Sequence, residues 1–178
     1  MLARLAGATP TMQQDWSKPQ DGVRARLVIT PATDDKHRKQ YEIALEVENA
    51  SDVDGGIPMS WGYVGDMLAL ELVDEQGKVV EHAGIGGNHA SSGPYIVKLP
   101  NDSMLRVTVT KQAIEYVDDK RALLRPMTFQ AWDWPVKAKG KLFLRGKLSP
   151  HPLDKADKTR PDPRAWTTTL ELPKVALP

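Results

Sequence analysis

The sequence predicts an all-β protein, an antiparallel immunoglobulin-like β-sandwich of about nine strands with at most one short helix. Segments in which apolar and polar residues alternate recur along the chain, as expected for strands with one buried face. The 14 prolines and 13 glycines are spread along the chain and interrupt every long helical pattern. The 178 residues suit one domain, with enough buried surface to form a core without disulfides.

The first part of the chain is predicted to form an arm, two long strands and a loop. Residues 1–20 are polar and aperiodic and are predicted to be an N-terminal arm, with the single sandwich domain at 21–178. Alternation of apolar and polar residues predicts the first strands at 22–30 and 41–47. Glycines, Pro58 and polar residues then predict a loop over 52–65.

The rest of the chain continues the β pattern. Gly77 suits the turn of a hairpin, and the glycine-rich stretch 83–93 is predicted to be an exposed loop. Helical spacing of apolar residues predicts the one helix within 111–124, ended by Pro126. A proline-rich loop is predicted at 150–164. The predicted later strands lie at 67–73, 79–82, 95–99, 104–110, 127–134, 139–148 and 166–172.

Two segments resemble bacterial immunoglobulin-like and fibronectin-like accessory domains. The run Tyr41-Glu-Ile-Ala-Leu-Glu-Val-Glu-Asn49-Ala-Ser, which ends in a polar loop, resembles an early strand of such domains. Residues 140–146, paired with 166–172, look like their last two strands. The resemblance covers about a third of the chain and consists of strand patterns, so it implies a fold and assigns no functional residue. The cysteines of antibody-type domains are absent.

The sequence contains no recognisable catalytic or cofactor motif, and we expect a protein that is not an enzyme, without cofactor or metal. The absence of cysteine excludes thiolate metal sites and cysteine nucleophiles. The glycine-rich loop lacks the Lys-Ser/Thr of a phosphate-binding loop, and no serine lies in a Gly-x-Ser-x-Gly turn. His82 and His89, with Glu81 beside them, do not have a recognised zinc-site spacing.

Charge is segregated along a chain whose net charge is +1. Residues 41–82 contain ten acidic residues and one basic residue, whereas residues 137–164 contain nine basic and three acidic residues. One face of the strand predicted there carries a ladder of positive charge, formed by Lys137, Lys139, Lys141, Arg145 and Lys147. If the acidic and basic strands are neighbours, these charges pair within the molecule. If they lie on opposite sides, the molecule is polar and self-association becomes attractive.

Aromatic residues supply a second candidate surface. Trp61 and Tyr63 lie in loop-like sequence, and Trp132 and Trp134 share one face of a predicted strand. Exposed indole or phenol rings at these positions would stack on a sugar ring or contact a protein, while buried rings would belong to the core.

These features favour a binding or assembly module that presents loops and a basic strand face to a protein or polymer partner. Protein partners or self-association are expected, carbohydrate is an alternative ligand, and nucleic acid is disfavoured by the near-zero net charge. A protease inhibitor that uses the loop at 150–164 is a further alternative. No apolar run is long enough to cross a membrane, and the start lacks a complete signal peptide. The compartment stays open between the cytoplasm and export with a signal missing from this chain.

Overall fold

The structure, a computed structural model, describes residues 11–13, 15–33, 39–52, 54–81, 83–84, 95–116, 121–127, 130–135, 140–151 and 165–178. Over these residues the chain is mostly antiparallel β with one helix, α1 (Val64–Met67), which confirms the all-β class. The strands are β1 (Met12–Gln13), β2 (Val23–Thr33), β3 (Lys39–Asn49), β4 (Ile57–Trp61), β5 (Leu68–Val73), β6 (Ala83–Gly84), β7 (Tyr95–Leu99), β8 (Met104–Tyr116), β9 (Arg121–Met127), β10 (Gln130–Pro135), β11 (Phe143–Leu148) and β12 (Leu170–Ala176).

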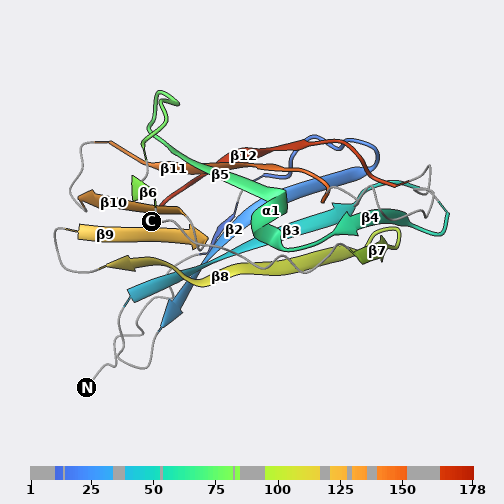
Figure 1. Cartoon of the computed structure of the whole chain (residues 1–178), viewed down its shortest axis with the longest axis horizontal. Coiled ribbons are helices and arrows are strands. Elements are labelled where there is room, and N and C mark those ends of the chain that lie inside the picture. Colours follow the sequence, from blue (N-terminus) through green and yellow to red (C-terminus); the bar gives the residue numbers. More distant parts are fainter. Residues whose placement is uncertain are drawn as a thin grey trace, which may run out of the picture.

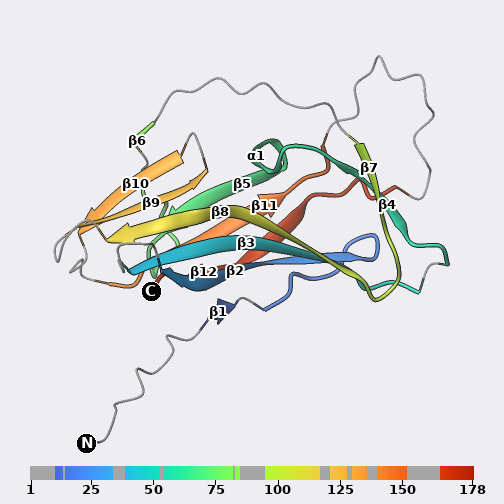
Figure 2. The same ribbon diagram turned by 90° about the horizontal axis from the view of Figure 1, so that it is seen from below.

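The strands form two facing layers (Figures 1 and 2). One sheet has the order β1-β2-β3-β8-β9-β10-β6, and a second has the order β12-β11-β5. In Figure 1 the second sheet lies over β2, β3 and β8, with β4 and β7 at one end of the molecule and β9 and β10 at the other. Strands β4 and β7 pair with each other as a separate two-stranded sheet.

The core lies between these layers and follows from the alternation in the sequence. Strands β2 and β3 pair along their whole length, so that apolar residues such as Leu27 and Leu45 lie opposite each other, both fully buried. From the other sheet, Leu72 of β5 and Leu144 of β11 are paired and fully buried. Burying each such side chain stabilises the fold by about 1.5–3 kcal/mol, which is why one face of each strand is apolar.

The chain reaches β2 through a tight hairpin. Asp21 (φ 50°) and Gly22 (φ 77°) have the positive φ angles of a type I′ turn, and Gln20 and Val23 exchange backbone hydrogen bonds of 2.8 and 2.9 Å. The preceding segment runs back along β2, where Ser17 N donates to Ala25 O (2.9 Å) and Ala25 N donates to Ser17 Oγ (3.0 Å). The described part of the predicted arm therefore packs along the edge of β2.

The helix predicted within 111–124 is wrong, because β8 continues to Tyr116 and β9 begins at Arg121. Ile114 is a fully buried strand residue that pairs with Tyr41 of β3 and Leu124 of β9. The register between β3 and β8 shifts twice near this point, so that Thr110 and Ile114 lie opposite Ile43 and Tyr41. These irregularities add residues to β8 relative to β3 and interrupt the alternation of buried and exposed residues along β8. The apolar residues there consequently have a spacing that resembles that of a helix.

The loop predicted at 52–65 contains both a strand and the helix. Ile57, Met59 and Trp61 alternate along β4 and are buried in the core, despite Pro58 and the neighbouring glycines. Helix α1 then separates β4 from β5, and Gly62 N donates to Met67 Sδ (3.3 Å) across it.

Other boundaries differ more modestly. The single strand predicted at 127–134 is replaced by the pair β9 and β10. The strands predicted at 139–148 and 166–172 are observed as β11 and β12, and each begins four residues later than predicted. Gly146 is buried in β11, where an added Cβ would lie 2.9 Å from Leu70 Cδ2. In the part of the chain that the structure describes, no helix has the length and apolar character needed to cross a membrane.

Candidate functional site

Two of the five residues of the predicted basic strand face, Arg145 and Lys147, form ion pairs with neighbouring strands. Arg145 lies opposite Glu71 of β5, and its Nε donates to Glu71 Oε2 at 2.8 Å. Lys147 lies opposite Glu171 of β12, with Nζ 2.8 Å from Oε1, and this hydrogen bond raises the pKa of Lys147. The carboxylate of Glu75 accepts a hydrogen bond from Lys141 N (3.3 Å). Lys137 and Lys139 lie outside the described residues.

A shallow hollow lies over Gly146 between these ion pairs. Its lining residues are Ala69, Glu71, Arg145, Gly146, Lys147 and Glu171. The hollow measures about 230 Å³, below the roughly 300–1,000 Å³ of ordinary ligand pockets. Its cations are already paired with its carboxylates, so it offers little free charge to a ligand.

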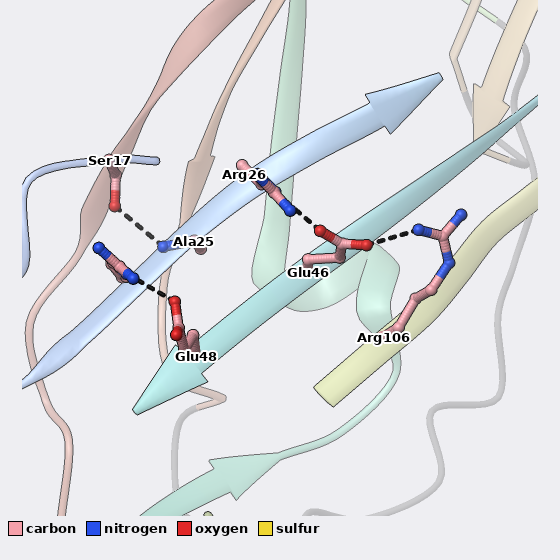
Figure 3. A network of polar contacts seen from close by, with 7 residues as sticks. Ser17, Ala25, Arg26, Glu46, Glu48 and Arg106 are labelled. Carbon is pink, nitrogen blue, oxygen red and sulfur yellow. Dashed lines mark hydrogen bonds and ion pairs between the residues drawn. The ribbon is translucent and has the colours of Figure 1, made fainter. Parts of the chain in front are cut away.

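The acidic face of β3 is also paired, but with different cations (Figure 3). Glu46 accepts hydrogen bonds from Arg26 Nε (2.7 Å) and Arg106 Nη1 (2.5 Å), and its side chain is only 6% exposed. Glu48 accepts one from Arg24 Nε (2.6 Å), which raises the pKa of Arg24. Glu46 and Glu48 of the acidic segment are thus paired with arginines of β2 and β8, whereas Glu71 of the same segment pairs with Arg145 of the basic segment.

An aromatic residue in the predicted arm completes this network. The guanidinium carbons of Arg24 and Arg26 lie 4.9 and 4.1 Å from the centre of the Trp16 ring, within cation–π range. Sequence reasoning missed this contact. The Asp21-Gly22 pair was the available signal, because a two-residue Asp-Gly turn predicts a hairpin that returns the arm to β2.

Trp61 does not form the exposed aromatic loop surface considered from the sequence. It belongs to β4 and is only 4% exposed. Tyr63 is partly buried, and its ring lies against Gly65 at the start of α1. Trp132 is also buried, at 2% exposure, and its Nε1 donates to Val80 O at 3.0 Å. These residues therefore do not form an exposed row of rings; the side chain of Trp134 lies outside the description.

A groove that the sequence did not reveal begins at the turn after β5. Lys78 N donates to Asp74 Oδ1 (2.8 Å), and Gly77, with φ 83°, lets the chain reverse. The returning segment lies beside β5, where Val79 bridges to Val73 and Val80 N donates to Leu72 O (2.8 Å). Since Val80 O accepts the Trp132 hydrogen bond, Val80 connects β5 of one sheet to β10 of the other.

The groove measures about 510 Å³, within the usual range of ligand pockets. Its lining residues are Ala69, Leu70, Glu71, Val79, Val80, Glu81 and Trp132. Val79 is 46% exposed, whereas Leu70 and Trp132 are buried at 3% and 2%, so the floor is buried and the rim is accessible. Glu71 is paired with Arg145, and the exposed Glu81 has no ion-pair partner among the described residues.

The histidines and the proline-rich loop, the remaining candidate sites, lie only partly within the described residues. Within the described ranges, no three His, Asp or Glu side chains are grouped closely enough to hold a metal ion. His82, His89 and residues 152–164 of the proline-rich loop lie outside those ranges. His151, at the start of that loop, has its Nε2 3.8 Å from Asp66 Oδ2.

No family model, curated protein or solved structure matches this chain.

Proposed function

We propose that this chain is a non-catalytic binding module that takes an apolar segment of a protein partner into the groove beside β5. The observation that carries the proposal is the groove itself, an open, mostly apolar groove of about 510 Å³ with a buried tryptophan in its floor. Val79 supplies accessible apolar surface at the rim of the groove, and binding clefts are commonly lined by such apolar side chains.

The charge at the groove supports a partner segment with a basic residue. Glu81 is exposed and lines the groove, so a Lys or Arg beside the bound apolar residues would find a free carboxylate. The carboxylate of Glu71 is occupied by Arg145 (2.8 Å) and contributes less. The expected ligand is therefore an apolar stretch flanked by a cation.

Selection from a library of random peptides displayed on phage tests this function. We expect the wild-type protein to enrich apolar peptides that contain Lys or Arg. Val79→Glu, which places a charge at the rim, should weaken the selected peptides at least about tenfold by calorimetry, or about 1.4 kcal/mol. Glu81→Lys should weaken the basic peptides specifically.

Met104→Lys is the matched control, because Met104 is similarly exposed (50%) but lies on β8, outside the groove lining. It should bind the selected peptides as the wild type does. Failure to enrich any peptide, or equal binding by the Val79→Glu protein, would exclude the groove as the binding site.

We also propose that the scaffold is a variant of the immunoglobulin-like sandwich. The pairing β2-β3-β8 opposite β12-β11-β5 supports this, because it has the order of the A-B-E and G-F-C strands of that fold. The variant pairs β7 with β4 and adds β9 and β10 between the strands that correspond to E and F. Nuclear Overhauser contacts between β3 and β11, the B and F positions, test it; their absence would argue against this fold.

Carbohydrate binding is less well supported than peptide binding. It requires a flat row of exposed rings, whereas Trp61 and Trp132 are buried. Rim-exposed aliphatic side chains such as Val79 suit peptide side chains better than sugar rings.

A further inference from the structure

Strand β7 carries a second apolar surface, separate from the groove. It pairs with β4 on one side, and no strand among the described residues pairs with its other side. Tyr95 and Ile96 are 55% and 56% exposed, among the largest exposed apolar side chains of the described chain. Exposed sheet edges are usually protected by charged residues, and here Lys98 is the charged residue of the strand.

The hydrogen bonds of β4 show which backbone groups of β7 point outward. Pro58 O and Ser60 O accept bonds from Trp166 N (2.9 Å) and His151 N (3.2 Å), on the side of β4 away from β7. In an antiparallel strand the N–H and C=O of one residue point to the same side, and the side alternates with each residue. The alternate residues of β4, which include Met59, therefore point toward β7.

The register then assigns the free edge. Met59 lies opposite Val97, and Trp61 lies opposite Tyr95, so Tyr95 and Val97 direct their backbone groups toward β4. Ile96 and Lys98 consequently direct their N–H and C=O groups away from it. Among the described residues, nothing pairs with this short set of backbone donors and acceptors, which lies beside exposed apolar side chains.

We propose that this edge pairs with the same edge of a second copy of the chain, antiparallel and centred on Val97. Ile96 would then exchange backbone hydrogen bonds with the partner's Lys98, and Lys98 with the partner's Ile96. Val97 would face the partner's Val97 at the two-fold axis. Every outward-pointing donor and acceptor of Ile96 and Lys98 is satisfied, and the result is a continuous sheet across the dimer.

Other antiparallel registers are poorer. Centring the pair on Ile96 places Lys98 opposite the partner's Pro94, which has no N–H to donate. Centring it on Lys98 sets two like charges opposite each other and places Ile96 opposite the partner's Pro100. Only the register centred on Val97 avoids both problems, and there the aliphatic stem of Lys98 lies beside an isoleucine.

The prolines at either end also explain why the pairing closes at a dimer. Pro94 and Pro100 flank the strand and limit the available edge to the residues between them. Because a two-fold contact uses the same edge on both copies, dimer formation consumes the β7 edge, and this contact does not propagate into a fibre. This pairing does not involve the groove, so either proposal can fail alone.

Single-cysteine variants test the register directly, since the native chain has no cysteine. We expect Val97→Cys to form a disulfide-linked dimer under mild oxidation, because residues at a non-hydrogen-bonded pair on the two-fold axis are close together. Lys98→Cys should cross-link more slowly, as its own partner in the dimer is Ile96. Met104→Cys is the matched exposed control and should not cross-link; equal cross-linking of all three variants would overturn the register.

A charge exchange tests the same pairing without cross-links. Ile96→Lys places a lysine opposite the partner's Lys98 twice per dimer and should weaken dimerisation about tenfold or more in sedimentation velocity. Lys98→Glu alone should be tolerated, and the Ile96→Lys/Lys98→Glu double variant should restore the dimer. A wild-type protein that stays monomeric at millimolar concentration, or a double variant that fails to recover although folded by circular dichroism, would overturn the proposal.

Discussion

Asn49 and Gly22 connect the ends of several strands at one end of the molecule. Asn49 is fully buried at the end of β3, where its Nδ2 donates to Leu99 O (3.0 Å) and its Oδ1 accepts from Ser51 N and Oγ (2.9 and 2.7 Å). Gly22 occupies the turn before β2, and its carbonyl oxygen accepts a hydrogen bond from Ala50 N (2.8 Å). Both residues therefore position the loop between β3 and β4 against the rest of the fold.

Replacing Asn49 with alanine should destabilise the protein by about 2–3 kcal/mol, because it leaves the buried Leu99 carbonyl and the Ser51 groups without their partner. Urea unfolding measures this change. Asn101→Ala, in the exposed turn after β7, is the control and should alter stability by less than about 0.5 kcal/mol. Similar effects of both variants would show that the Asn49 contacts are not important for stability.

Alanine substitutions at Gly22 and at Gly77 distinguish the cost of backbone strain from the cost of steric crowding. Both have positive φ (77° and 83°), but an added Cβ at Gly22 would lie 2.6 Å from Ser51 Cβ, whereas nothing lies within 4 Å of one at Gly77. We expect Gly77→Ala to cost about 1–2 kcal/mol from its conformation alone. Gly22→Ala should cost about 1–3 kcal/mol more, from overpacking. Equal losses in thermal or urea unfolding would contradict the crowded turn.

At the scale of elements, the two outer faces carry ion pairs of different character. The network on β2, β3 and β8 encloses Glu46, whose side chain is 6% exposed, between two arginines. The pairs on β5, β11 and β12 are open to solvent, with Glu71 and Arg145 at 42% and 43% exposure. Because burial removes the competing water, the first network should contribute much more to specificity and stability than the second.

Two glutamate-to-glutamine variants compare these faces. Glu46→Gln should lower stability by about 2–3 kcal/mol, since it removes a buried charge that is hydrogen-bonded to two guanidinium groups, of which Arg26 is the more buried. Glu71→Gln should cost no more than about 0.2–1 kcal/mol, as is typical of exposed pairs. Guanidinium chloride would screen both pairs, so urea is the suitable denaturant. A larger effect at Glu71 than at Glu46 would reverse the order of importance assigned to the two sheets.

For the whole molecule, ion pairs between neighbouring strands balance part of the charge that the sequence segregates. Acidic residues of β3 meet arginines of β2 and β8, and the described cations of β11 meet glutamates of β5 and β12. Along the described parts of β3 and β11, most charged side chains have an opposite charge on a neighbouring strand. Association of two copies should therefore depend on apolar contact and strand pairing more than on opposite charge.

Light scattering after size-exclusion chromatography tests this expectation. The mass should be the same at low salt and at about 0.5 M, where the Debye length is roughly 4 Å. Hydrophobic and backbone contacts at β7 are insensitive to such screening, whereas assembly through opposite charges would dissociate. An oligomer that falls apart at high salt would show that charged surfaces, and not the β7 edge, hold the copies together.

The sequence by itself determined the β class, the strands with unbroken alternation and the outward direction of the charged residues on β3 and β11. It failed where alternation was interrupted. Register shifts disguised the end of β8 as a helix, and Pro58 with its neighbouring glycines concealed β4. The Asp21-Gly22 turn was visible in the sequence, but its consequence, Trp16 lying over two arginines, required the arm to be placed in space.

Only the tertiary structure decided which strands became neighbours, and with them the groove, the β7 edge and the partner of each charge. Alternation is a local property, because it depends on which face of a single strand meets the core. Pairing depends on residues far apart in the chain, as when Arg145 meets Glu71 or Val80 bridges Leu72 and Trp132. A local pattern therefore predicts burial within a strand, while a binding surface built between strands emerges only once the sheet order and register are known.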